Sequence, residues 1–309
     1  MASLKELSKQ GNLFTPGHRA CAGCGATVIL RNLMATAGKD VVLGGATGCM
    51  EVVSTIYPYT SWDVNFVHNA FENSAATVSG IETAYRALKK KGKIDKDIKF
   101  IAFGGDGGTY DIGLQSLSGA VERGHNMLYL CYNNGAYMNT GIQRSSATPY
   151  GAHTTTSPAG SVVKGKMQLA KDLTEIMIAN GAHYVAQSDP YHWNDLSKKI
   201  DKAMNTDGPT FINVFSPCPL GWGSDPSKSI EIAKLSVETL FWPVYEFENG
   251  RYTINIKPKK VKDIEEFLFT QVRFRHLKDE PEIIEEIKKQ INEKWEDLLK
   301  KEKCTNSEG

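Results

Sequence analysis

The sequence predicts an α/β fold, a mostly parallel sheet with helices on both faces. Short apolar runs of strand length alternate along the chain with segments of helical periodicity. Several of these runs stop at glycine or asparagine pairs, as strands do where they enter a turn. Because parallel strands need a long crossover between them, strand, helix and strand in succession predict right-handed βαβ units.

The individual elements follow from this alternation. Predicted strands cover residues 40–44, 98–103, 127–132, 183–187 and 210–215. Predicted helices cover residues 75–90, 112–123, 169–180 and 191–204. Residues 140–166 are rich in Ser, Thr, Gly and Pro and predict a long loop, and loops of that length inside a compact domain commonly carry function.

The alternation ends near Trp222, so we expect two units, residues 1–222 and a C-terminal extension of residues 223–309. Within the extension, residues 246–256 predict a hairpin that turns at Asn249-Gly250. Residues 281–301 predict an amphipathic helix with isoleucine and leucine along one face. That face either packs on its own domain or contacts another subunit, and the sequence leaves both interpretations open.

Composition excludes several classes of function. The 309 residues are 41% hydrophobic and 23% charged, with a formal net charge of +1, which gives no argument for nucleic-acid binding. No segment approaches the roughly 18 apolar residues of a membrane span, and residues 1–12 lack the apolar stretch of a signal peptide. We therefore expect a cytoplasmic protein that binds neither nucleic acid nor membrane.

Two polar motifs lie at the ends of neighbouring predicted strands. Gly105-Asp106-Gly107 follows one strand, and Asn133-Asn134 follows the next. Since open α/β sheets bind ligands along the carboxyl edge of their strands, both motifs fall where a ligand is expected. The carboxylate of Asp106, the amide oxygen of Asn134 and a carbonyl just beyond, at Ala136, suit Mg²⁺, and the glycines allow close approach of a diphosphate. The alternative is a pair of purely structural turns.

Four of the six cysteines lie at loop positions flanked by Gly or Pro. Because thiols of a cytoplasmic protein stay reduced, metal binding explains this grouping better than disulfides do. Zinc and a [4Fe–4S] cluster both remain possible, and the presence of a single CxxC motif favours the cluster. The four are Cys21, Cys24, Cys49 and Cys218. Cys131 lies inside a predicted strand as a small hydrophobic residue, and Cys304 lies in the polar tail.

Four stretches in order resemble the β subunit of pyruvate:ferredoxin oxidoreductase and its relatives, the thiamine-diphosphate-binding subunit of 2-oxoacid:ferredoxin oxidoreductases. They are residues 17–25, 46–53, 103–112 and 137–143, and the resemblance extends over about residues 17–242. It implies a thiamine-diphosphate-binding fold in residues 1–222. It also implies coenzyme A-dependent oxidative decarboxylation of a 2-oxoacid, with pyruvate converted to acetyl-CoA and CO₂ and one-electron transfer to ferredoxin, in anaerobic metabolism.

The resemblance also implies roles for individual residues. The [4Fe–4S] cluster would be bound by Cys21, Cys24, Cys49 and Cys218. Magnesium would be bound by Asp106, Asn134 and the Ala136 carbonyl. The diphosphate would be held by Gly107, Gly108, Thr109 and Thr140. The cofactor would be lined by Thr47, Gly48, Cys49 and Phe71, while Asn139 would be the catalytic residue facing the substrate. Some relatives carry a glutamate two residues after the CxxC; here Ala26 occupies that place, so this contact is not expected.

Partners follow from the same resemblance. An α subunit would supply the glutamate that activates the cofactor and the arginine that holds the 2-oxoacid, while γ and ferredoxin-like δ subunits would complete the hetero-oligomer. His18, His68 and Glu72 lie near the motifs, in either a proton-handling or a structural role.

Four functional hypotheses are consistent with the sequence. The first is the pyruvate enzyme, which the similarity along residues 46–53 and 137–149 favours. The second is an enzyme of the same family for oxalate or branched-chain 2-oxoacids, and Val52 does not decide between them. The third is a thiamine-dependent decarboxylase without a redox cluster. The fourth is a non-catalytic electron-transfer module, which leaves Asp106 and Asn134 without a role.

Overall fold

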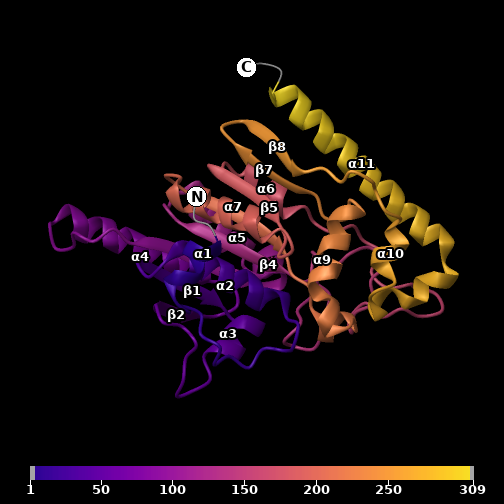
Figure 1. Cartoon of the computed structure of the whole chain (residues 1–309), viewed down its shortest axis with the longest axis horizontal. Helices are drawn as coiled ribbons and strands as arrows, with labels where there is room; N and C mark the ends of the chain where they lie inside the picture. Colours follow the sequence, from indigo (N-terminus) through magenta and orange to yellow (C-terminus); the bar gives the residue numbers. More distant parts are fainter. Residues whose placement is uncertain (1–3, 307–309) are drawn as a thin grey trace.

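A computed structural model describes residues 4–306 and centres on one eight-stranded sheet (Figure 1). The strands lie in the order β2-β1-β3-β4-β6-β5-β7-β8. All neighbours are parallel except β5 with β7 and β7 with β8, which are antiparallel. The strands are β1 Val41–Ala46, β2 Asn65–Asn69, β3 Lys99–Gly105, β4 Leu128–Asn133, β5 Tyr184–Ser188, β6 Thr210–Phe215, β7 Val244–Glu248 and β8 Arg251–Ile256. The predicted α/β class with a mostly parallel sheet is confirmed.

Helices cover both faces of the sheet, each over its own hydrophobic core. One core joins α2 and α7 to the sheet, and the other joins α4, α5 and α6 to the opposite face. The helices of these layers are α2 Gly25–Ala37, α4 Ser74–Lys90, α5 Leu114–Glu122, α6 Leu173–Ala179 and α7 Trp193–Asn205. Alternate residues of β4 enter opposite cores, Leu130 one and Cys131 the other. Because both faces are buried, the central strands are continuous apolar runs.

Several elements differ from their predicted bounds. The short edge strand β2 was missed because most of its residues are only half-buried or exposed, so it lacks an apolar run. The helix expected from residue 112 is preceded by a π-helical turn, Gly107–Asp111, and α5 begins at Leu114. The helix expected from residue 169 begins only at Leu173, where the side chain of Asp172 accepts a hydrogen bond from the Glu175 N–H and caps it.

The ends of the long loop are held by a buried lysine. Lys166 is 1% exposed, and its ammonium donates to the carbonyls of Ser146, Thr148 and Leu169. Burial lowers the pKa of Lys166 to about 8. Residues 169–172 lie outside the helix that their apolar pattern predicts, and the Leu169 carbonyl is bonded by Lys166 instead.

A third core lies beyond the sheet's end, among the C-terminal elements. These are α8 Pro219–Trp222, α9 Ser229–Glu238, α10 Ile264–Leu268, the 3-10 segment η4 Val272–Asp279 and α11 Pro281–Asn306. The apolar face of α11 packs on its own chain through Ile284, Ile287 and Leu298. No helix of the described part of the chain is both long and apolar enough to cross a bilayer.

The hairpin β7–β8 continues the main sheet, and α11 runs beside its outer strand (Figure 1). Side chains of α11 bond the backbone of β8. The Tyr252 N–H donates to Thr305 Oγ1 at 3.0 Å, and the Ile254 N–H donates to Glu302 Oε1 at 2.8 Å. The division of the chain at residue 222 stays a prediction.

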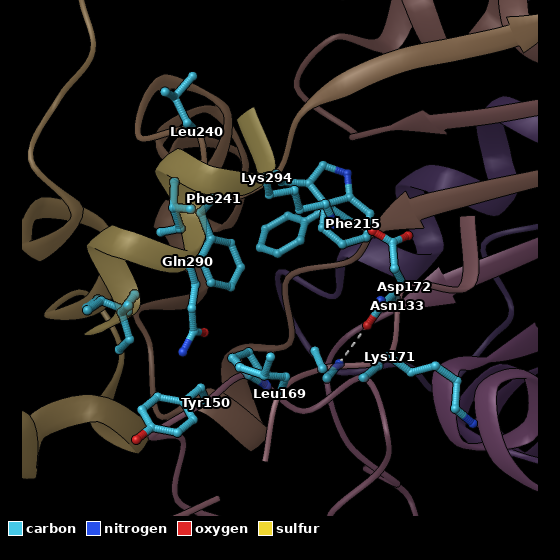
Figure 2. A pocket seen from close by; sticks show the side chains of 18 of the residues that line it. Asn133, Tyr150, Leu169, Lys171, Asp172, Phe215, Leu240, Phe241, Gln290 and Lys294 are labelled. Atoms are coloured by element: carbon cyan, nitrogen blue, oxygen red, sulfur yellow. Dashed lines mark hydrogen bonds and ion pairs between the residues drawn. The ribbon is translucent and has the colours of Figure 1, made fainter. Parts of the chain in front are cut away.

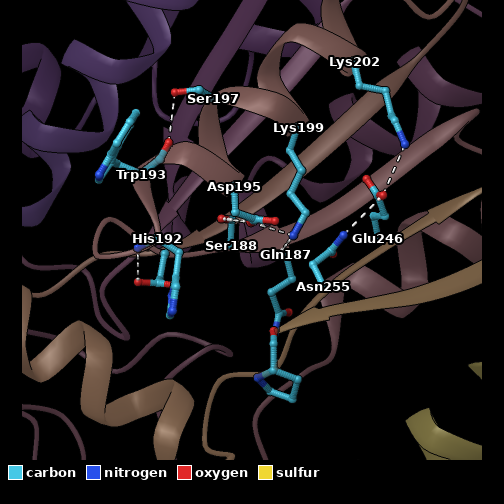
Figure 3. A network of polar contacts seen from close by, with 12 residues as sticks. Gln187, Ser188, His192, Trp193, Asp195, Ser197, Lys199, Lys202, Glu246 and Asn255 are labelled. Carbon is cyan, nitrogen blue, oxygen red and sulfur yellow. Dashed lines mark hydrogen bonds and ion pairs between the residues drawn. The ribbon is translucent and has the colours of Figure 1, made fainter. Parts of the chain in front are cut away.

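A buried polar network fastens the helix α7 to the sheet beside this hairpin (Figure 3). Lys199 is 1% exposed, and its ammonium lies 2.8 Å from Asp195 Oδ2 and 2.9 Å from the Gln187 carbonyl. Ser188 donates to the same Asp195 oxygen at 2.7 Å. Because the lysine is paired and hydrogen-bonded, its charge is compensated inside the protein.

Candidate active site

A narrow cleft opens at the carboxyl edge of the sheet. Loops that follow β1, β2, β3 and β4 form its walls, as the position of a ligand site in an open α/β sheet requires. It is lined by Thr47, Gly48, Cys49, Phe71, Gly105, Gly107, Gly108, Tyr132, Asn134, Ala136, Tyr137, Met138 and Asn139. Most of the residues expected from the motifs therefore converge on one cleft.

Three expected residues do not line the cleft. Asp106 lies fully buried beneath it, next to Asn134. Thr109 is also buried, and its hydroxyl turns inward to donate to the Gly105 carbonyl at 2.7 Å. Thr140 is exposed, and its hydroxyl bonds the side chain of Gln143.

Three oxygens gather at the floor of the cleft. The amide oxygen of Asn134 lies 2.9 Å from the Ala136 carbonyl oxygen and 2.9 Å from Asp106 Oδ1. Turned by 180°, the amide would donate hydrogen bonds to both instead. Octahedral Mg²⁺, with bonds of about 2.0–2.1 Å, holds adjacent ligand oxygens about 2.9 Å apart. The three groups thus have the donor chemistry and the spacing that fit this ion.

Burial also couples the protonation of Asp106 to the binding of a cation. Burial raises the pKa of the Asp106 carboxyl to about 7, although hydrogen bonds from the Ser145 hydroxyl and the Asn134 N–H oppose the rise. The Ser145 hydroxyl donates to Oδ2, and the Asn134 N–H donates to Oδ1 at 3.1 Å. A bound cation would favour the ionised carboxylate, so cation binding and loss of this proton are coupled.

This coupling predicts a pH dependence with a defined sign. Between about pH 4 and pH 7 the folded, cation-free protein holds a proton on Asp106 that the unfolded chain releases. Its free energy of unfolding should therefore fall as pH rises through this window, by up to about 1.4 kcal/mol per pH unit from this group. Mg²⁺ affinity should rise over the same window, up to about tenfold per unit.

Urea unfolding between pH 5 and 8, with and without Mg²⁺, measures both effects. The Asp106→Asn variant is the control, because an amide does not titrate and should remove this part of the pH dependence. An unchanged pH dependence in that variant would contradict the assignment to Asp106.

The four expected cysteines form a second group beside the cleft. Cys21 and Cys24 precede α2, Cys49 opens the helix α3 Cys49–Ser54, and Cys218 precedes α8. Burial raises the pKa of Cys49 to about 12, and the nearby charges of Cys218, Cys24 and Cys21 add to the rise. These four are named the thiol group. None is in a disulfide, and in residues 4–306 no three His, Cys, Asp or Glu side chains are arranged to hold a single metal ion.

A glycine brings two parts of the thiol group together. The Gly25 N–H donates to the Pro217 carbonyl at 2.9 Å, so the residue after Cys24 touches the residue before Cys218. A Cβ atom on Gly25 would lie 2.7 Å from Pro217 Cδ and 2.8 Å from its nitrogen. Only glycine allows this approach of the two loops.

The cleft and the thiol group share a wall. Cys49 lines the cleft and belongs to the thiol group. Asn139 also lines the cleft, and its side chain hydrogen-bonds the Cys49 thiol. Met138 extends this wall, since its sulfur packs against Gly221 of α8, three residues after Cys218. A molecule in the cleft and a centre held by the thiols would therefore be immediate neighbours.

Comparison with known proteins identifies the family. Residues 46–214, which contain every cleft residue, match the thiamine pyrophosphate enzyme, C-terminal TPP binding domain. The chain is 56% identical to the pyruvate synthase subunit PorB of Methanocaldococcus jannaschii, over 91% of this chain and 94% of that protein. It is 52% identical to PorB of Thermotoga maritima, over 97% and 95%. The chain belongs to the β subunits of the 2-oxoacid:ferredoxin oxidoreductases.

Two further relatives extend the comparison of this β subunit. The ketoisovalerate oxidoreductase subunit VorB of Pyrococcus furiosus is 45% identical, over 93% of this chain and 92% of that protein. A 2-oxoglutarate:ferredoxin oxidoreductase from Magnetococcus marinus has the same fold, with a TM-score of 0.58 at 23% identity over 73% of this chain and 79% of that one.

Some residues of the β-subunit site were not expected from the motifs. Tyr137 covers Gly107, whose Cβ atom would lie 2.4 Å from the tyrosine ring. Ser145, in the long loop, donates a hydrogen bond to Asp106.

His68 lies outside the cleft, where its Nδ1 pairs with the buried Glu51 at 2.7 Å. His18 stacks on a phenylalanine, Phe14, with ring centroids 5.0 Å apart.

The β subunit also contains a larger cavity of about 380 Å³ between α11 and the sheet (Figure 2). Asn134 lines both this cavity and the cleft. Its walls are largely aromatic and aliphatic, and Asp172 and Lys294 on its rim pair with each other at 2.6 Å.

Proposed function

We propose that the chain is the thiamine-diphosphate- and [4Fe–4S]-binding subunit of an enzyme that oxidises a 2-oxoacid to an acyl-CoA and CO₂, with pyruvate as the substrate, and passes electrons singly to ferredoxin. One observation carries the proposal: Cys49 belongs both to the cleft and to the thiol group, and Asn139 lines the cleft next to it. Carbon chemistry in the cleft is then adjacent to a one-electron acceptor.

Magnesium and diphosphate are assigned to the floor of the cleft. Asp106, Asn134 and the Ala136 carbonyl would hold Mg²⁺, which the 2.9 Å spacing of their oxygens supports. Gly107 and Gly108 also line the cleft, where a Cβ atom would lie 2.4 Å from the Tyr137 ring and 3.1 Å from the Phe71 carbonyl oxygen, respectively, so that neither place accepts a side chain.

The cluster is assigned to the thiol group. Three of the four thiols are only half-buried and Cys21 is exposed, so the group is open on one side. The Gly221 N–H bonds the Cys218 thiol and opposes the burial that raises its pKa to about 11. Thiolates so close together repel one another, and a cationic iron centre would relieve this repulsion.

When bound, the cofactor would accept the electron pair of the carbon–carbon bond that breaks as CO₂ leaves. The residues of this chain would exclude water from the cleft and orient the substrate. Phe71, Tyr137 and Met138 make apolar walls that exclude water from the cleft. Asn139 lines the cleft and its side chain interacts with the Cys49 thiol, so its amide could orient a substrate group or hold that sulfur in place.

Substrate and partners follow from the relatives. The identities of 56% and 52% are to pyruvate synthase subunits, which supports pyruvate, while PorB and VorB of Pyrococcus furiosus are 46% and 45% identical to this chain and do not separate the two substrates. We expect α, γ and ferredoxin-like δ subunits, coenzyme A and ferredoxin as partners, in the cytoplasm. Thr109 and Thr140 stay predicted diphosphate contacts.

Anaerobic purification with the neighbouring subunits, followed by dye reduction with pyruvate, 2-oxoisovalerate, 2-oxoglutarate and oxalate, tests the proposal. We expect pyruvate to be the preferred substrate and acetyl-CoA the product. We also expect about four iron and four sulfide ions bound to this chain, the content of one cubane. No reduction with any of these acids would sink the proposal. Activity of the chain without iron would favour a thiamine-dependent decarboxylase. A bound cluster without thiamine diphosphate would favour a non-catalytic electron-transfer module.

The contact between Gly25 and Pro217 gives a sharper test of the cluster. In Gly25→Ala the new methyl group pushes the Cys218 loop away from Cys24, and iron content should fall by more than about tenfold when iron is limiting. The matched control is Gly80→Ala in α4, where a Cβ atom meets nothing within 4 Å. Full iron content in the Gly25 variant would show that the two loops do not bind one cluster.

A further inference from the structure

Arg273 is a buried cation without a carboxylate partner. Its side chain lies in η4, and the residue is 5% exposed. Its guanidinium donates to Gln271 Oε1 at 2.9 Å and to the Asn134 carbonyl at 3.4 Å. In the described part of the chain no Asp or Glu forms an ion pair with it. An unpaired buried charge is costly, so a counter-charge has to be supplied from elsewhere.

The position of Arg273 connects the two functional groups. Its Cζ lies 4.1 Å from the ring centroid of Trp222, which belongs to the helix that follows Cys218. The Trp222 indole donates to the same Asn134 carbonyl at 2.7 Å, and the Trp222 N–H donates to the Cys218 carbonyl at 2.9 Å. Arg273 thus touches the proposed magnesium loop on one side and the cluster-binding helix on the other.

The charges that face Arg273 come from the same two groups. Burial lowers its pKa to about 9, and Cys218 and Asp106 are the nearby ionisable groups that favour its charged form. The other groups around it are neutral, namely Gln271, Phe274, Trp222 and the backbone of Gly135. Its natural counter-charge is therefore the anionic centre that the thiols would hold.

We propose that Arg273 is a positioning residue that acts as the internal counter-ion of the thiol-bound cluster and makes its reduction easier. This inference rests on the proposed function. A cubane on four thiolates would be anionic, and its reduction by one electron would add a further negative charge. A fixed cation in a water-poor interior lowers the cost of that charge, and the stack on Trp222 keeps it in place.

The test is a redox titration of the assembled complex, followed by electron paramagnetic resonance, in Arg273→Met, Arg273→Gln and Arg273→Lys. The two neutral variants should shift the midpoint potential of this cluster downward by a tenfold change in the one-electron equilibrium constant or more, about 59 mV. Arg273→Lys should keep most of the wild-type potential. Arg275→Gln, at an exposed position two residues away, is the matched control. Clusters of partner subunits serve as internal references.

The outcomes separate the two proposals. Wild-type complex without iron on this chain would refute the proposed function itself. Neutral variants with full iron content and unchanged potential would overturn the role of Arg273. An equal shift in the lysine variant would also overturn it, because shape rather than charge would then be responsible. If the methionine variant does not assemble, the glutamine variant, which keeps a donor toward the Asn134 carbonyl, gives the same comparison.

Discussion

Replacement of Asp106 by asparagine is expected to abolish cofactor binding and lower kcat/KM for the 2-oxoacid by roughly three orders of magnitude, or about 4 kcal/mol. The residue is fully buried, and its Oδ1 lies 2.9 Å from the Asn134 amide oxygen at the proposed ion position. An amide at this place removes the anionic ligand and turns an N–H₂ group toward the Ser145 hydroxyl or the Asn134 N–H, both of which are donors.

Thiamine diphosphate binding by equilibrium dialysis, with and without Mg²⁺, measures this effect directly. The control is Asp97→Asn, whose side chain is 86% exposed at the surface and pairs with Lys89. Circular dichroism of the Asp106 variant should match the wild type, which separates loss of the ligand from loss of the fold. Binding of the cofactor at wild-type affinity by this variant would refute the magnesium assignment.

Replacement of Cys24 by serine is expected to have the second largest effect. A neutral hydroxyl is a poor iron ligand, so iron content should drop and dye reduction should fall by roughly a hundredfold. Thiamine diphosphate binding should change by less than about twofold, since Cys24 does not line the cleft. Iron analysis, visible absorbance and dialysis on the same sample separate the two effects.

A parallel variant tests the shared wall. Cys49→Ser should lower both iron content and cofactor affinity, because Cys49 lies in the cleft as well as in the thiol group. Cys304→Ser, at an exposed position of α11, is the control and should retain both. If the Cys24 and Cys49 variants lose the two properties to the same extent, the cleft and the thiol group are not separable in the way that the geometry indicates.

The sequence predicted the central strands well because each is buried on both faces and is therefore mostly apolar, as in residues 210–215, where Thr210 and Asn213 are the two polar residues. It did not predict β2, which lies at an edge, nor the late start of α6, where Lys166 bonds the Leu169 carbonyl and Asp172 caps the helix. A local sequence pattern shows whether a strand is buried on both faces. It does not show that a side chain will form hydrogen bonds with a distant part of a loop.

The same distinction applies to the site. The cleft residues Gly107, Gly108, Asn134 and Ala136 were predictable because they lie in short motifs directly after strands, whereas Tyr132, Tyr137 and Met138 were not. Ser145 and Arg273 were not, since each meets its partner only through folding: Ser145 bonds Asp106 across 39 positions, and Arg273 meets Asn134 across 139. No sequence motif identifies either residue as part of the site.

The contacts between α11 and β8 have a consequence for how this protein behaves in a crowded solution. An outer strand offers unpaired N–H and C=O groups on which another chain can add its own strand, and such growth leads to aggregates. Here Thr305 and Glu302 accept the free N–H groups of β8, and Asn306 donates to the Tyr252 carbonyl. The last turns of α11 thus end the growth of the sheet, so that assembly is left to surfaces other than this edge.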